Sequence, residues 1–473
     1  MYDHAMTDRP LEPDPRQLET MTRAVADFVL AHVASLGEQP SFDLDGVEAV
    51  RASFREDVPE AGRPLAEILE RLRPAFAKSY NTAGPGYLAY IPGGGVYAAA
   101  LADFIATAAN RYVGVTQAAP VLAQIEETAV AWLRTLMGLP AGARGILTSG
   151  GSLSNFGAIV TARHERLGED FQKASIYFSG ETHYCVTKAA RLAGFPRASL
   201  RELPTDGRLR LVPAALERAI GEDRVLGRRP FLVVVSVGTT NTGAIDPLPE
   251  VLRIAREHGL WVHADAAYGG FFRLTPGGEA LLRGIEECDS ITLDPHKGLF
   301  LPYGLGALLV RDGAALGRAH RESASYVQDV AEEGSLGFAD LSPELSRDFR
   351  GLRLWLPLLL HGVAAFREQL VEKLELARWA YAQLSADPRF EMLDEPQLSV
   401  VAFRLRADAA EADRLGPELL RRVNARRRVF LSSTRIGGRY ALRICVLSYR
   451  THADRVRDAV EALREEAHGL LDG

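Results

Sequence analysis

The sequence predicts an α/β protein built on a mostly parallel central sheet. Between residues 85 and 360, short apolar runs alternate with segments whose apolar residues recur at helical spacing. This alternation is typical of βαβ units, in which helices cover both faces of a parallel sheet. Polar residues recur just after the apolar runs, and open sheets of this kind bind ligands at the carboxyl ends of their strands.

The elements expected from periodicity follow the chain in order. The first part should be helical, at residues 18–36, 47–54 and 64–78. The central strands are expected at 175–178, 231–237, 260–264, 290–293 and 306–310. The central helices are expected at 156–167, 186–192, 213–220 and 249–258. A long helix at 349–384 should lead to strands near 398–405, 429–432 and 441–447 and to a last helix at 454–466.

Length and composition limit the class of protein. A chain of 473 residues can bury a large core and should form more than one domain. Its net charge of -6 favours neither nucleic acid nor an anionic membrane as a partner, and no apolar run is long enough to span a bilayer. The polar N-terminus shows no signal peptide. Three scattered cysteines form no disulfide or metal pattern, which indicates a reducing, cytoplasmic location and no metal site.

The most informative motif is Asp294-Pro295-His296-Lys297, which follows an apolar strand. A lysine held by turn residues at a strand end can be desolvated, lose its proton near neutral pH and form a Schiff base with an aldehyde. That chemistry indicates pyridoxal 5'-phosphate (PLP). Most lysines are merely solvated charges, so the interpretation depends on partner residues elsewhere in the chain.

The first partner is Asp265, at the end of the apolar run 260–264. Such a run is typical of a buried parallel strand. A carboxylate at its end can keep the pyridine nitrogen of PLP protonated, so that the ring accepts electrons. Asp265 could instead cap a turn before Gly269, but the presence of Lys297 favours the cofactor interpretation.

A second partner is the glycine turn Gly150-Gly151-Ser152, which opens a helix. Adjacent glycines allow close approach of the backbone, and N–H groups at a helix start attract phosphate. A plain turn with a serine N-cap is the alternative.

Two further polar residues follow apolar strands. His183 lies at a strand–helix junction, where an imidazole can stack on a flat ring, hydrogen-bond a carboxylate or simply be a satisfied polar group. Thr240 could bond the cofactor's ring oxygen or steady Asp265.

As a set, these motifs resemble the PLP-dependent group II amino-acid decarboxylases, in particular the aromatic-L-amino-acid decarboxylases, from about Pro85 to about Val460. The resemblance implies the PLP-dependent transferase type I fold, as in aspartate aminotransferase. It implies a helical dimerisation segment at 1–84, a PLP-binding α/β domain at 85–360 and a small C-terminal α/β domain at 361–473. It also implies a lyase that converts an L-amino acid to the amine and carbon dioxide, as a homodimer with its active site at the subunit interface.

The resemblance also assigns roles. Lys297 forms the Schiff base, Asp265 pairs with the pyridinium, Ala267 packs against the ring and His183 stacks on its other face. By the same resemblance, the residues that bind the phosphate are Gly150, Gly151, Ser152 and His296. Asp294 stands where the animal aromatic enzymes often carry Asn, and a carboxylate is not a natural phosphate ligand, so no phosphate role is transferred to it.

Substrate recognition is assigned less directly. Arg443 sits where the family places an arginine near the substrate carboxylate, although a structural salt bridge would also satisfy a strand arginine. Tyr80, Tyr87 and Tyr90 lie in a segment similar to the family's early pocket loop and could line a pocket or serve as packing. This loop lacks a cationic cluster, which favours an aromatic over an acidic substrate. Gly298, however, replaces a tryptophan common in aromatic decarboxylases.

The family closes its site with a loop that often carries a tyrosine, thought to protonate the substrate carbon. We expect this loop at 324–343, which is rich in Ser, Gly and acidic residues. Counting back without gaps from Arg347 puts Phe338 at the tyrosine position, and Tyr326 lies in the same loop. Relatives with Phe there yield an aldehyde, so oxidative deamination is the leading alternative to amine formation. Another PLP-dependent carbon–carbon lyase is a further alternative.

Overall fold

The computed structural model describes residues 11–322 and 336–471 and centres on a seven-stranded sheet of order β1-β7-β6-β5-β4-β2-β3. Neighbouring strands from β3 to β6 are parallel, and only β7 runs against its neighbours β6 and β1. The predicted mostly parallel sheet is therefore confirmed. The strands are β1 (Arg144–Thr148), β2 (Ala174–Ser179), β3 (Leu200–Leu203), β4 (Arg229–Ser236), β5 (Trp261–Asp265), β6 (Ser290–Leu293) and β7 (Gly306–Val310).

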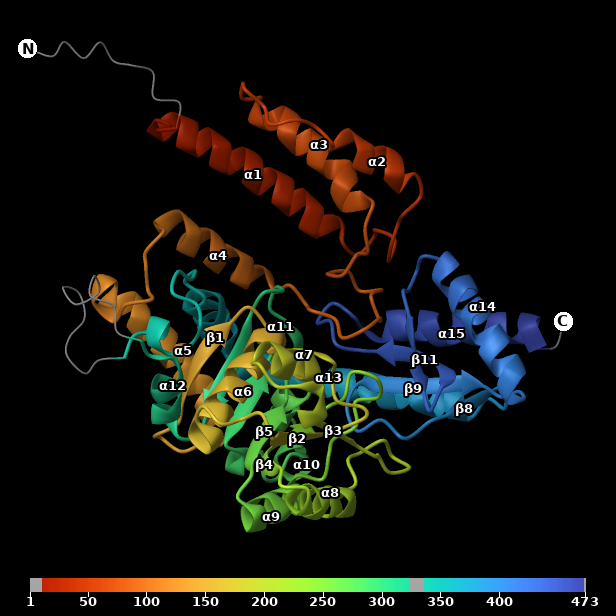
Figure 1. The fold of residues 1–473 in the computed structure, drawn as a ribbon. Helices are drawn as coiled ribbons and strands as arrows, with labels where there is room; N and C mark the ends of the chain where they lie inside the picture. Colours follow the sequence, from red (N-terminus) through yellow and green to blue (C-terminus); the bar gives the residue numbers. More distant parts are fainter. Residues whose placement is uncertain (1–10, 323–335, 472–473) are drawn as a thin grey trace, which may run out of the picture.

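Helices cover both faces of this sheet (Figure 1). Successive residues of β4 point to opposite faces: Leu232 and Val234 pack in the same apolar cluster as α6 and α7, whereas Val233 and Val235 pack with α8 and α9. A strand buried on both faces has no polar side, which explains its continuous apolar run. The helices are α4 (Tyr97–Ala109), α5 (Pro120–Leu136), α6 (Gly151–Leu167), α7 (Cys185–Leu192), α8 (Pro213–Val225), α9 (Leu248–His258), α10 (Gly278–Leu281), α11 (Pro295–Gly298) and α12 (Gly313–His320).

A second, antiparallel sheet of order β10-β11-β9-β8 follows the long helix α13 (Gly351–Ser385), which is kinked at Gly362, where φ is 70°. The predicted strand at 429–432 is displaced, because Phe430 hydrogen-bonds the segment at Gly86 and Leu88 and β10 begins only at Ser432. The elements are β8 (Phe390–Met392), β9 (Val400–Leu405), α14 (Ala409–Ala425), β10 (Ser432–Ile436), β11 (Arg439–Cys445) and α15 (Ala453–Leu471).

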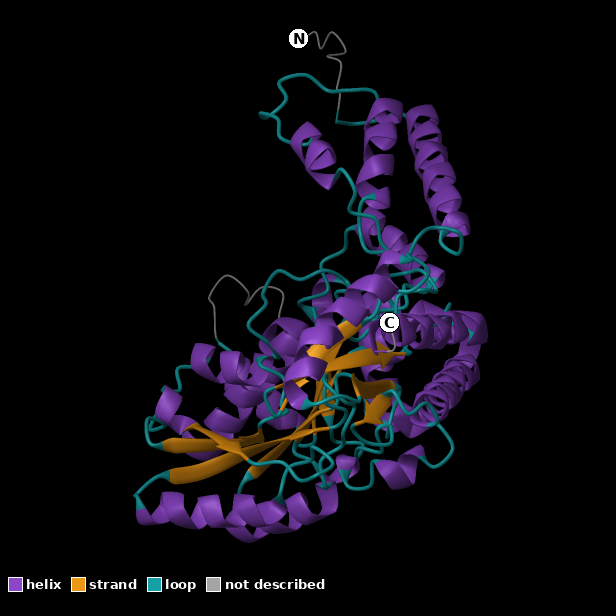
Figure 2. Ribbon diagram, turned by 90° about the vertical axis from the view of Figure 1, so that its right-hand side faces the viewer, coloured by secondary structure: helices purple, strands orange, loops and turns teal. Residues whose placement is uncertain are grey.

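The first three helices stand apart from both sheets (Figures 1 and 2). They are α1 (Pro15–Ser35), α2 (Val47–Ser53) and α3 (Leu65–Ala77), and none of their residues is buried. Large apolar side chains on α1 and α3 are exposed, among them Leu18, Met21 and Phe76. The packing of this segment on a partner subunit stays a prediction. Within the described ranges, no helix combines the length and apolarity needed to cross a membrane.

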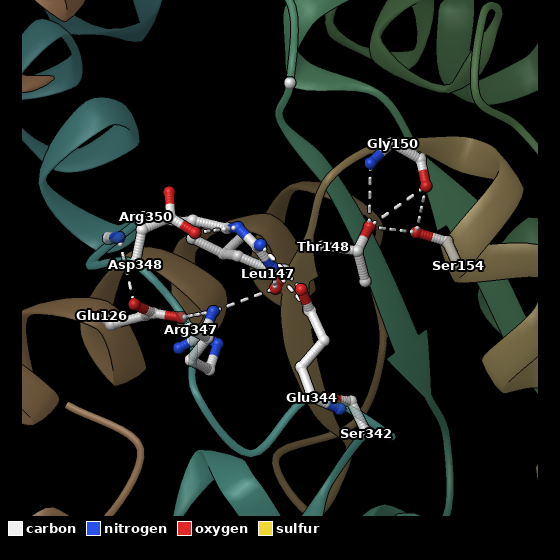
Figure 3. Close-up of polar contacts among 12 residues, drawn as sticks. Glu126, Leu147, Thr148, Gly150, Ser154, Ser342, Glu344, Arg347, Asp348 and Arg350 are labelled. Atoms are coloured by element: carbon white, nitrogen blue, oxygen red, sulfur yellow. Dashed lines mark hydrogen bonds and ion pairs between the residues drawn. The ribbon is translucent and has the colours of Figure 1, made fainter. Parts of the chain in front are cut away.

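A buried ion pair fastens the chain before α13 to the edge of the main sheet (Figure 3). Arg347 Nη2 lies 2.6 Å from Glu126 Oε1 and donates to the Leu147 carbonyl at 2.9 Å, and both charged side chains are fully buried. Beyond Leu147, the Thr148 hydroxyl lies 2.7 Å from the Ser154 hydroxyl and also contacts Gly150. The hydrogen bonds of Thr148 therefore fix the glycine turn that follows β1.

We expect Arg347→Met to destabilise the protein by about 3–5 kcal/mol, because it leaves the Glu126 carboxylate buried without its cation. Burial already raises the pKa of Glu126, and Arg347 opposes that shift. Thermal unfolding should show a lower midpoint for Arg347→Met and a partial recovery in the double variant Glu126→Gln/Arg347→Met, which buries no lone charge. A single variant as stable as the parent protein would contradict this assignment.

Candidate active site

One cavity gathers all the predicted catalytic and cofactor residues. Its walls come from the segments that follow β1, β2, β4, β5 and β6, and parallel strands bring those carboxyl ends to one edge of the sheet. The predicted residues that line it are Gly150, Gly151, Ser152, His183, Thr240, Asp265, Ala267, His296 and Lys297.

Lys297 is held by a neighbouring carboxylate. Its Nζ lies 3.0 Å from Oδ2 of Asp294, which is buried. Burial alone would lower the pKa of Lys297, but the negative charges of Asp294 and Asp265 outweigh it, so the pKa is raised. The raised pKa keeps Lys297 protonated beside Asp294, against the predicted loss of its proton near neutral pH. Lys297 must leave Asp294 before its amine can act as a nucleophile.

Asp265 ends β5, and both of its oxygens are engaged. The backbone N–H of Ala267 approaches Oδ1 at 3.3 Å, and Asn155 Nδ2 donates to Oδ2 at 3.0 Å. Asn155 in turn accepts from His263 Nε2 at 2.7 Å. The hydrogen bond that steadies Asp265 thus comes from Asn155, a residue to which the sequence assigned no role.

His183 presents a neutral imidazole to the cavity. Burial lowers the pKa of His183, with Asp265 opposing that shift and Lys297 adding to it. The backbone N–H of Cys185 donates to Nδ1 at 3.3 Å, so the proton of the neutral ring is on Nε2. His183 can therefore donate from Nε2 to an anionic ligand.

The glycine turn fits the phosphate of PLP. Gly150 has a φ of 152°, and a Cβ added at Gly151 would lie 3.0 Å from Asp294 Oδ2, so the backbone approaches the cavity where a side chain would stand. Helix α6 begins here without a side-chain cap, which leaves its N-terminus to attract an anion. His296 Nδ1 donates to the Leu305 carbonyl at 2.6 Å, and its Nε2 lies 3.7 Å from Asp294 Oδ2.

Arg443 lies behind the cavity rather than in its wall. It is buried on β11 and donates to the carbonyls of Asn241 at 2.8 Å, Tyr90 at 3.2 Å and Thr240, and to the Ser432 hydroxyl at 3.0 Å. None of the carboxylates that the structure describes forms an ion pair with it, so the alternative of a structural salt bridge is not realised among these residues. No described carboxylate therefore neutralises the charge of Arg443.

Two other predicted substrate residues lie outside the cavity of this chain. The ring of Tyr80 packs 4.6 Å from that of Phe430, centroid to centroid. Phe338 is buried with its ring 5.0 Å from the guanidinium of Arg347, beside α5 and β1. Most of the expected closing loop, including Tyr326, falls in residues 323–335, outside the described residues.

Comparison with known proteins settles the family. Residues 48–406 match the family model described as the pyridoxal-dependent decarboxylase conserved domain. The chain belongs to this family. An aromatic-L-amino-acid decarboxylase of Bacillus atrophaeus is 33% identical over 466 residues, which cover 96% of this chain and 97% of the relative. The protein is thus an enzyme of PLP chemistry, as the lysine and its partners predicted.

Solved structures agree in fold. Oryza sativa TDC with PLP and tryptamine superposes with a TM-score of 0.93 at 28% identity, covering 98% of this chain and 100% of that one. Rhodiola rosea 4-hydroxyphenylacetaldehyde synthase gives a TM-score of 0.89 at 25% identity, covering 98% and 99%. Both structural matches extend over almost the whole of this chain.

We expect the decarboxylase to lose stability as the pH falls from about 6.5 towards 4, in part because of His263. Burial lowers the pKa of His263 from 6.5 to about 4. In that window the unfolded chain binds a proton at His263 that the folded chain does not, so folding is penalised by about 2 kcal/mol at pH 5. Thermal unfolding of the cofactor-free protein should therefore depend less on pH between 8 and 5 in His263→Asn. An unchanged dependence would contradict the buried neutral imidazole.

Proposed function

We propose that this enzyme decarboxylates an aromatic L-amino acid to the amine and carbon dioxide. One observation carries the proposal: Lys297, Asp265 and His183 line one cavity, and the buried guanidinium of Arg443, which none of the described carboxylates pairs with, donates to the carbonyl of the cavity residue Thr240. This arrangement provides a cofactor site and a positive charge for the carboxylate that is to be lost.

The cofactor is held by groups of complementary charge. PLP, when bound, supplies the electron sink for the carbon that loses carbon dioxide. Lys297 would hold it through its amine, and the anionic Asp265 would keep the pyridine nitrogen protonated. The first turn of α6, with His296, would hold the phosphate.

His183 and Arg443 would act on the substrate. The Nε2–H of His183 can donate to the α-carboxylate, and Arg443 adds attraction through its charge, since its N–H groups are largely used on protein carbonyls. A carboxylate held at that end can be set perpendicular to the cofactor ring, which is the orientation that favours loss of carbon dioxide. After that loss, His183 or an acid from the closing loop would deliver a proton to the substrate carbon.

An aromatic side chain is supported by the relatives. The Bacillus relative is named for aromatic L-amino acids, and the Oryza structure contains tryptamine. Gly298, which weakens the resemblance to aromatic enzymes, is buried against Phe271: a Cβ at 298 would lie 2.8 Å from the Phe271 Cβ. Phe271 therefore occupies the space that a larger residue at 298 would need.

Oxidative deamination to an aldehyde is the second candidate. The observation that favours it is the likeness to the Rhodiola rosea 4-hydroxyphenylacetaldehyde synthase over nearly the whole chain. In this reaction molecular oxygen accepts two electrons, water supplies the aldehyde oxygen, and the products are aldehyde, carbon dioxide, ammonia and hydrogen peroxide.

We further propose a cytoplasmic homodimer with its active site at the subunit interface. Free buried cysteines (Cys185, Cys288 and Cys445) suit a reducing compartment. The exposed apolar side chains of α1 and α3 suit burial against a second copy of this chain.

We expect Lys297→Ala to lose the visible absorbance of bound PLP and more than a thousandfold of turnover, because Lys297 is the one lysine among the described residues that line the cavity. Absorbance spectra and steady-state rates measure the two effects. Lys188→Ala is the matched control, since Lys188 is an exposed lysine of α7. Retention of full turnover in Lys297→Ala would refute the assignment.

We expect amine and carbon dioxide in equal amounts when the purified enzyme is incubated with tryptophan, tyrosine or phenylalanine, and slower turnover of glutamate. Carbon dioxide, amine, aldehyde and peroxide should be measured in the same reaction. Aldehyde and peroxide in place of amine would establish the second candidate and overturn the first.

A further inference from the structure

A buried polar network lies behind Asp265, between the sheet and helix α6. Trp261, His263 and Asp265 alternate along β5, so their side chains point to the same face. Ser290 and Thr292 face them from β6, where they pair in register with His263 and Asp265. Asn155 of α6 packs onto this face, and its side chain is fully buried. Three separate elements thus converge on one carboxylate.

The amide of Asn155 can stand in only one orientation. Its Oδ1 accepts from His263 Nε2 at 2.7 Å and from the Thr292 hydroxyl at 3.0 Å. Its Nδ2 donates to Asp265 Oδ2 at 3.0 Å and to Cys185 Sγ at 3.2 Å. A flipped amide would place its oxygen against the Asp265 carboxylate, which is repulsive. Both donors and both acceptor sites of the amide are therefore used.

The hydrogen bonds behind Asn155 run in the same direction. Trp261 Nε1 donates to Ser290 Oγ at 2.8 Å, and His263 Nδ1 lies 2.8 Å from the same oxygen. Because His263 uses its one proton at Nε2 towards Asn155, Nδ1 must accept from the Ser290 hydroxyl. The chain Trp261–Ser290–His263–Asn155 thus points every proton towards Asp265, and aligned bonds of this kind strengthen one another.

We propose that Asn155 and His263 are positioning residues that fix Asp265 against the pyridine nitrogen of PLP. The inference rests on the proposed role of Asp265. Asn155 donates to Oδ2 and the Ala267 N–H approaches Oδ1, so the carboxylate is held in one orientation towards the ring N–H. His263 is neutral, so the network places no second charged group beside Asp265 that could compete for the proton of the ring nitrogen. Loss of the network leaves the carboxylate free to turn.

The test uses PLP and 1-deazapyridoxal phosphate, in which a C–H replaces the ring nitrogen. Apparent dissociation constants of both compounds are measured for the full-length protein, for Asn155→Leu and for Thr292→Val. Thr161→Val is the control, because Thr161 is a buried hydroxyl of the same helix that bonds Gly157 and His320 instead. We expect Asn155→Leu to reduce the preference for PLP over the analogue by about tenfold.

Thr292→Val should reduce this preference less, since it removes only one of the two donors to Asn155 Oδ1, and it tests the same inference if Asn155→Leu does not fold. Thr161→Val should leave the preference unchanged. Equal weakening of both compounds in Asn155→Leu or Thr292→Val, with the preference intact, would overturn the inference and leave a structural role only. A preference that survives in Asp265→Asn would instead overturn the proposed role of Asp265 itself.

Discussion

The cavity depends on how its buried charges are balanced. The ammonium of Lys297 lies 3.0 Å from Asp294 and is also attracted by Asp265, so one cation serves two carboxylates. His183, which also lines the cavity, is neutral, because burial lowers its pKa. The two buried carboxylates thus share the compensation that the Lys297 ammonium provides. In the role proposed for Asp265, the protonated ring of PLP would give this carboxylate a cation of its own.

The architecture could be predicted from the sequence because it follows from local pattern. The strand that carries Asp265 is apolar throughout, and its parallel neighbours must bring their ends to the same edge of the sheet. That geometry alone gathers Lys297, His183 and the glycine turn in one place. The short strand β3 was missed, since Arg201 and Glu202 interrupt its apolar pattern at the edge of the sheet.

The contacts that hold these residues could not be predicted in the same way. Asn155 and Asp265 are 110 positions apart, and Glu126 and Arg347 are 221 apart. The spacing of residues in the sequence does not indicate contacts at such separations. For His263 a weak signal existed, because it precedes Asp265 by two residues and shares its face of the strand. Counting without gaps to Phe338 led to a packed residue outside the cavity, since loops have no periodicity that fixes their register.

Helix α6 ties the two ends of the cofactor site together. Gly151, in its first turn, lines the cavity at the turn proposed to hold the phosphate, and Asn155, four residues later, bonds Asp265, the carboxylate proposed to face the ring nitrogen. Residues four apart lie on the same face of a helix, one turn from each other. The distance between the two contact points is therefore set by a rigid element. Arg347 and Glu126 brace the strand end that leads into this helix, so a displacement there would move both contact points together.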